Sequence, residues 1–131
     1  MIGLDTNVLL RLWVQDDPVQ AEAARGFVSE HGRLPGSLRV SDAAVLEAVW
    51  TLKSVYGYSR TQISTALQSL LDEPAYALAD GECMRAALEG YRRSSADFGD
   101  CLIAADNASA GCTFTVTFDR AASRLPGMRA L

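Results

Sequence analysis

"MIGLDTNVLLRL", residues 1–12, is largely apolar, but Asp5, Thr6 and Asn7 form a polar group within it. Residues 1–5 are expected to form a short buried strand, and residues 8–14 one or two turns of helix. A carboxylate beside a protein core is costly unless it is paired or binds a metal ion. The stretch therefore predicts an α/β beginning and a partner for Asp5 elsewhere in the chain.

Strands and helices are expected to alternate along the rest of the sequence. Further short strands are predicted at 38–41, 75–79 and 112–118, and helices are predicted to begin near Pro18, Ser41 or Asp42, Ser59, Asp80 and Asp97. The helices that begin near Ser41 and Ser59 are expected to form a hairpin. This order predicts one α/β domain over residues 1–131 with a mainly parallel sheet, in which functional sites gather at the carboxyl ends of the strands.

Length and composition agree with one globular domain. With 131 residues, of which 49% are hydrophobic, the chain is long enough to bury a core without disulfide or metal staples. It has no apolar run of the length that a membrane span needs and no signal peptide pattern, so a cytoplasmic protein is expected. The three cysteines Cys83, Cys101 and Cys112 form no CxxC pair, which predicts buried reduced thiols rather than a zinc site.

Five acidic residues fall at places where parallel-sheet proteins build sites. Asp5 and Asp119 follow strands, Glu47 and Asp100 lie on helices, and Asp97 is one helical turn before Asp100. If these carboxylates converge, they favour protonation or a hard divalent cation such as Mg²⁺ or Mn²⁺. Each acid alone also has a structural explanation, as a helix cap, a turn cap or a solvated helix residue.

The sequence excludes several other chemistries. His31 is the only histidine, and neither GxxxxGK[ST] nor GxGxxG occurs, so histidine dyads and the common nucleotide-binding loops are absent and no nucleotide cofactor is expected. A phosphotransferase with an aspartate nucleophile on its first strand needs a second acid at the position of Asn7. A hydrolase in this chain would therefore take its nucleophile from metal-bound water.

Four stretches resemble a known family. "LDTNVLLRLWVQDDP", "VLEAVWTL", "DFGDCLIAADNASAGC" and "TVTFDRA" are similar, in this order, to PIN-domain ribonucleases, specifically the VapC toxins of type II toxin–antitoxin modules. Each motif is short, but together they run essentially from end to end. The resemblance implies a PIN-like three-layer α/β/α sandwich and a Mg²⁺- or Mn²⁺-dependent endoribonuclease that cleaves RNA. It also implies a cognate VapB-type antitoxin and a homodimer.

The resemblance assigns roles to individual residues. The catalytic and metal-binding acids that it implies are Asp5, Glu47, Asp100 and Asp119, with Asp97 as an accessory ligand. The polar residues that it places beside the first and last acids are Thr6, Asn7 and Thr117. An antitoxin segment would find apolar anchors at Trp13, Val49, Trp50 and the helix pair 43–56 and 59–72, unless these residues belong to the core.

The net charge of −4, taken alone, disfavours an RNA partner, because phosphate binding favours a positive surface. Without the five candidate acids, however, 12 basic residues face 11 acidic ones. Candidates for RNA contact, which are otherwise ordinary surface charges, are Arg11, Lys53, Arg92, Arg93, Arg120 and Arg124.

The alternative to an enzyme is a non-catalytic PIN-like module that binds RNA or protein. The last residues, "MRAL" at 128–131, are expected to contribute little to a final strand.

Overall fold

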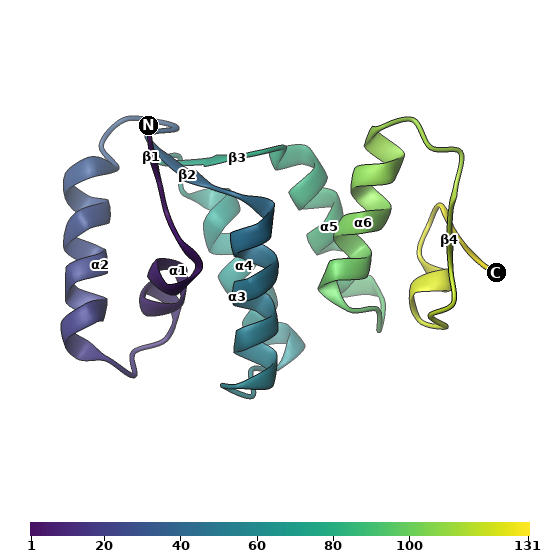
Figure 1. Cartoon of the computed structure of the whole chain (residues 1–131), viewed down its shortest axis with the longest axis horizontal. Helices are drawn as coiled ribbons and strands as arrows, with labels where there is room; N and C mark the ends of the chain where they lie inside the picture. The colour runs from purple at the N-terminus through teal and green to yellow at the C-terminus, as the bar shows by residue number, and fades with distance from the viewer. The chain divides into compact units, whose positions relative to one another are not determined.

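A computed structural model describes all residues from 1 to 131 and divides them into two compact units, Met1–Ala79 and Asp80–Leu131 (Figure 1). The first unit holds the first three strands and four helices, and the second holds the rest of the chain. The single domain predicted over residues 1–131 stays a prediction.

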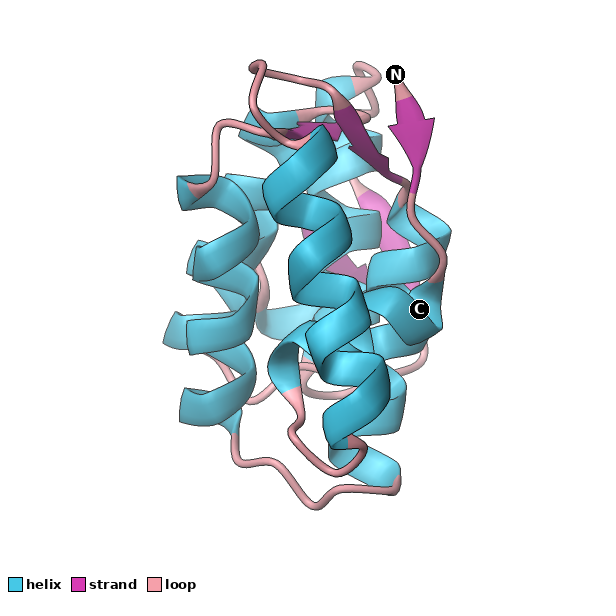
Figure 2. Ribbon diagram, turned by 90° about the vertical axis from the view of Figure 1, so that its left-hand side faces the viewer, coloured by secondary structure: helices cyan, strands magenta, loops and turns pink.

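The first unit contains a three-stranded parallel sheet. Its strands are β1 (Ile2–Gly3), β2 (Leu38–Val40) and β3 (Tyr76–Leu78), in the order β1-β2-β3, with Ile2 opposite Leu38 and Leu38 opposite Tyr76. The helices of this unit are α1 (Thr6–Trp13), α2 (Pro18–His31), α3 (Asp42–Ser54) and α4 (Arg60–Asp72). Figure 2 shows these helices extending below the short strands. Each strand is therefore followed by helical chain, as the sequence predicts.

Local caps explain where these helices begin. Ser41, rather than Asp42, caps α3, because its hydroxyl accepts the Ala44 N–H at 3.2 Å. At α4, Ser59 and Gln62 form a capping box in which each side chain accepts the backbone N–H of the other residue. The chain between the two helices turns at Gly57, whose φ of +65° suits a residue without a Cβ. The predicted hairpin of α3 and α4 is confirmed.

The core of the first unit lies on one face of β2. Leu38 and Val40 are fully buried, whereas Arg39 between them is exposed. The helices supply other fully buried side chains, which are Leu9, Val45, Leu52, Ile63 and Leu67. The first strand was expected to be buried, but Ile2 is 39% exposed, because β1 is the edge strand of this sheet. Leu4, just after the strand, is buried instead.

The second unit combines two helices with a small parallel sheet. It consists of α5 (Gly81–Arg93), α6 (Phe98–Ser109), β4 (Thr115–Thr117), the 3₁₀ helix η1 (Ala122–Arg124) and β5 (Met128–Ala130). Met84, Leu88 and Tyr91 of α5 are buried, and the Tyr91 ring meets the Phe98 ring edge-on at 5.8 Å. Residues 128–130 pair in parallel with β4, so the expectation that they contribute little to a final strand is wrong.

The predicted α/β class and the parallel pairing are confirmed, since every strand pair is parallel. None of the three cysteines forms a disulfide, and Cys83 and Cys101 are buried as expected. Cys112 is exposed, which corrects the prediction of a third buried thiol, because it lies after the end of α6 rather than in a packed element. None of the helices has both the length and the hydropathy of a membrane span.

Candidate active site

Asp5 lies at the point where the first strand passes into the first helix. It is the N-cap of α1, and its Oδ1 accepts the backbone N–H of Thr6 at 2.8 Å. The carboxylate is exposed. The costly burial suggested by the sequence does not occur, and the turn-capping explanation of Asp5 is realised.

Glu47 of α3 is brought to Asp5 through Thr6. The Thr6 hydroxyl donates a hydrogen bond to Glu47 Oε2 at 2.9 Å, and the Thr6 backbone N–H is the group that binds Asp5. This single residue therefore connects two acids that are far apart in the sequence. Glu47 lies on the exposed face of its helix with Ala43, so it is a polar group at the surface and not part of the core.

Asp97 and Asp100 lie in the first turn of α6. Asp97 occupies the N-cap position, yet its side chain makes no capping hydrogen bond. Asp100, one turn further along, is partly buried. A carboxylate in the first turn interacts favourably with the helix dipole. The capping explanation of Asp97 therefore accounts for its position but not for the interactions of its carboxylate.

Asp119 follows β4 and begins the turn into η1. Its Oδ1 accepts the Ala122 N–H at 2.8 Å, and its own backbone N–H donates to the Thr117 hydroxyl at 3.0 Å. Thr117 thus fixes the backbone at Asp119, and Asp119 caps the closing 3₁₀ helix. The structural explanation predicted for Asp119 is realised without occupying both of its carboxylate oxygens.

The acids of the second unit influence one another electrostatically. Burial raises the pKa of the Asp100 carboxyl above its ordinary value, and the negative charges of Asp119 and Asp97 raise this pKa further. Asp100 therefore retains its proton to a higher pH than an isolated aspartate. A nearby positive charge would reverse this effect, because it favours the ionised carboxylate.

Neither unit contains three His, Cys, Asp or Glu side chains arranged to hold a metal ion. The first unit brings together Asp5 and Glu47, and the second brings Asp97, Asp100 and Asp119 into electrostatic contact. All these donors are carboxylates, which suit hard divalent cations. Carboxylate donors were predicted from the sequence, but the connection of Asp5 and Glu47 through Thr6 was not.

The comparisons with known proteins identify the family of the chain. The PIN domain family matches residues 2–128, nearly the whole sequence. The chain belongs to the PIN domain family. This PIN-domain chain is also similar to the VapC ribonuclease of Aquifex aeolicus (strain VF5), with 25% identity over 122 residues that cover 93% of the chain and 90% of the relative. The resemblance predicted from the four motifs is confirmed.

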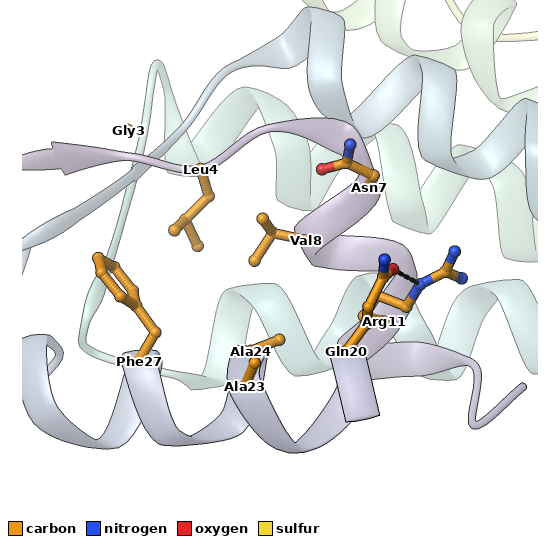
Figure 3. A pocket seen from close by; sticks show the side chains of 9 residues that line it. All are labelled: Gly3, Leu4, Asn7, Val8, Arg11, Gln20, Ala23, Ala24 and Phe27. Atoms are coloured by element: carbon orange, nitrogen blue, oxygen red, sulfur yellow. Dashed lines mark hydrogen bonds between the residues drawn. The ribbon is translucent and has the colours of Figure 1, made fainter. Parts of the chain in front are cut away.

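Asn7 of the PIN domain lines a groove between α1 and α2 with a volume of about 420 Å³. Figure 3 shows Leu4, Val8 and Phe27 pointing into the groove and the Arg11–Gln20 pair at one end of it. The predicted support of Asp5 by Asn7 stays a prediction. This groove could not be predicted from the sequence, because its walls come from separate elements.

The basic residues proposed for RNA contact differ in their surroundings. Arg11 is held by Asp16 at 3.0 Å and by Gln20 at 2.6 Å, which fixes its guanidinium at the groove. Arg93 pairs with Glu89 at 2.8 Å on the surface of α5. The remaining candidates are exposed side chains, namely Lys53, Arg92, Arg120 and Arg124.

The residues predicted as apolar anchors for an antitoxin differ in their exposure. Val49 is only 8% exposed and belongs to the core of the first unit, which is the alternative to an anchor that the sequence left open for it. Trp50 is 66% exposed. Trp13 is half-buried, and its ring N–H donates to the Ser69 hydroxyl at 3.2 Å.

Proposed function

We propose that this protein is a metal-dependent endoribonuclease toxin of the VapC type, which cleaves cellular RNA by water attack on a phosphodiester bond. The observation that carries this proposal is the group of Asp97, Asp100 and Asp119, in which burial and then the charges of Asp119 and Asp97 raise the pKa of Asp100. Such a group is unfavourable for stability and favourable for cation binding. The PIN domain match and the VapC ribonuclease relative support the same reaction.

The chemistry of the donors fits Mg²⁺ or Mn²⁺. Carboxylate oxygens are the preferred protein ligands of these cations, and the proposed ligands are Asp5, Glu47, Asp100 and Asp119, with Asp97 as an accessory. When bound, the cation would polarise the scissile phosphate and make an attacking water more acidic.

The surrounding polar groups would position these acids. Thr6 holds Glu47 by its hydroxyl and Asp5 by its backbone N–H, while Thr117 fixes the backbone at Asp119. The loss of a polar group that orients a metal-binding side chain commonly lowers metal affinity or activity. Thr6 and Thr117 are therefore positioning residues in this proposal, and the acids are the catalytic ones.

The proposed function is tested with purified protein that has been separated from any bound antitoxin. A total cellular RNA pool is incubated with it in Mg²⁺, in Mn²⁺ and in EDTA, and the products are resolved by gel electrophoresis. Discrete fragments are expected in the presence of either cation and none in EDTA, because the proposed cleavage needs a cation to polarise the phosphate and to make the attacking water more acidic. Fragments of equal yield in EDTA would contradict metal dependence, and intact RNA under every condition would contradict the nuclease.

The Thr6→Val variant is expected to lower cleavage by about tenfold to a hundredfold. Valine keeps the backbone N–H that binds Asp5 but lacks the hydroxyl that holds Glu47. Initial rates at several Mg²⁺ concentrations would measure the effect, and Thr6→Ser, which retains the hydroxyl, should restore most of the rate. Thr65→Val, at an exposed threonine of α4, is the control. A rate unchanged in Thr6→Val would exclude the positioning role.

Two partners extend the proposal. Neutralisation by a cognate antitoxin is proposed from the likeness to a VapC ribonuclease. Exposed Trp50 remains as a candidate anchor for the antitoxin. The homodimer implied by the sequence resemblance stays a prediction, as does the cytoplasmic location.

The alternative function is a PIN-like module that binds RNA or protein without cutting it. This alternative predicts RNA binding with no cleavage under any metal condition. The acid group of the second unit favours the enzyme, because a module that only binds RNA gains nothing from three repelling carboxylates.

A further inference from the structure

The second unit contains a pocket that the acids do not line. It has a volume of about 360 Å³ and lies among α5, α6 and the segment that follows η1. The residues that determine its character are Gly90, Arg93, Cys101, Ala104, Arg124 and Leu125. All of them come from the same unit, so the pocket is a feature of one compact part of the chain.

The floor of the pocket is apolar. Cys101 and Leu125 are 3% and 6% exposed, and the half-buried Ala104 extends this surface along α6. Gly90 of α5 contributes no side chain. A Cβ at this position would lie 3.6 Å from Leu125 Cδ2 and 3.9 Å from Cys101 Sγ. The floor is therefore formed by small and apolar groups.

The rim of the pocket is positively charged. Arg93 pairs with Glu89 in an exposed i,i+4 arrangement, in which the two side chains are 78% and 59% exposed, and such surface pairs are weak. Arg124 is exposed and forms no ion pair. The lining of the pocket thus carries two guanidinium groups, of Arg93 and Arg124, and one carboxylate, of Glu89. An anionic group that reaches the rim would meet an excess of positive charge and donors in bidentate geometry.

The pocket is built on the elements that carry the acids of this unit. Cys101 is the residue after Asp100 on α6. Arg124 ends η1, the 3₁₀ helix whose Ala122 N–H donates to Asp119. A ligand in the pocket is therefore held by the same short segments that position Asp100 and Asp119.

We propose that this pocket holds one nucleotide of the RNA substrate, with its phosphate at Arg93 and Arg124 and its base against the apolar floor. The proposal rests on the proposed ribonuclease function and assigns a binding site to it. A nucleotide combines the two properties that the pocket offers, because it joins a flat base to an anionic phosphate. Phosphate contacts are independent of sequence, so the pocket would position the strand rather than select it.

The test separates binding from cleavage. A fluorescein-labelled single-stranded RNA oligonucleotide is titrated with the full chain in EDTA, and fluorescence anisotropy gives the dissociation constant. The double variant Arg93→Gln and Arg124→Gln is expected to bind about tenfold more weakly, and its affinity should depend less on salt, by about 0.7 in the log–log slope for each lost contact. The control is Arg33→Gln with Arg85→Gln, which removes the same charge at exposed positions outside the pocket.

A second variant tests the floor without changing the charge. Ala104→Leu adds apolar volume to the pocket and is expected to weaken binding severalfold while leaving the salt dependence unchanged. Circular dichroism would establish that each variant is folded, and Gly90→Ala, for which the floor has room, offers a milder substitution if Ala104→Leu does not fold.

The outcomes distinguish this site from the proposed function. Weaker binding in the double variant and in the floor variant, but not in the control, supports the pocket whether or not Mg²⁺ then starts cleavage. Equal binding by wild type, double variant and control overturns the pocket, even if the wild type cleaves RNA in Mg²⁺. An equal loss of RNA affinity in the double variant and in the control would also overturn the pocket, because the loss would then reflect only the change in net charge.

Discussion

Replacing Asp100 with asparagine is expected to lower the rate of RNA cleavage by about 10³-fold. Asparagine keeps the size of the side chain and removes its charge. In the wild-type protein, burial and the charges of Asp119 and Asp97 raise the pKa of Asp100, and a bound cation would oppose this effect because it favours the ionised carboxylate. Loss of the charge therefore removes a strong electrostatic contribution to cation binding, which accounts for the large expected effect.

The Asp106→Asn variant is the matched control for Asp100→Asn. Asp106 lies on the same helix and is exposed, so the substitution removes one negative charge from α6 without changing the first turn. Single-turnover rates of cleavage would be compared in Mg²⁺, and anisotropy in EDTA would show whether RNA still binds. Cleavage by Asp100→Asn at the rate of the control would exclude Asp100 from the reaction.

Local signals in the sequence predicted most of the helices. The capping box of Ser59 and Gln62 and the spacing of Met84, Leu88 and Tyr91 depend on residues within a few positions of one another. Such interactions form within one element and are independent of the rest of the fold. For this reason, the predicted starts of α4 and α5 agree with the structure.

Strand burial and pairing were harder to predict, because they depend on segments that are distant in the sequence. Ile2 was expected in the core, but β1 is an edge strand, and its neighbour β2 begins only at Leu38. Residues 128–130 form a strand because β4 offers them a partner, although their own sequence is a weak strand signal. Propensity within a short segment does not contain this information.

In the candidate site, too, some features follow from local sequence and others depend on contacts between distant segments. The resemblance placed acids at Asp5, Glu47, Asp100 and Asp119, and the chemistry of carboxylates predicted a hard cation. The hydrogen bond from Thr6 to Glu47 spans 41 positions in the sequence and follows from the contact between α1 and α3. Only the folded arrangement of these helices identifies Thr6 as the residue that connects the first two acids.

Replacing Leu67 with alanine is expected to lower the free energy of unfolding by about 2–5 kcal/mol. Leu67 lies on α4, and its side chain is fully buried. The substitution removes apolar contact and leaves a cavity in the core of the first unit. Because small proteins are stable by only about 5–15 kcal/mol, this loss is a large part of the total. Urea denaturation followed by circular dichroism would measure it, with Thr61→Ala on the exposed face of α4 as control.

The same variant tests the predicted single domain. If residues 1–131 unfold as one cooperative domain, Leu67→Ala lowers the stability of every segment equally, including α6 in the second unit. Native-state hydrogen exchange read by mass spectrometry would give the opening free energies of peptides from both units. Equal losses in α4 and α6 are expected for one domain. A loss confined to peptides of Met1–Ala79 would contradict the single domain, and the acids of the second unit would then lie on an element that folds independently of Leu67.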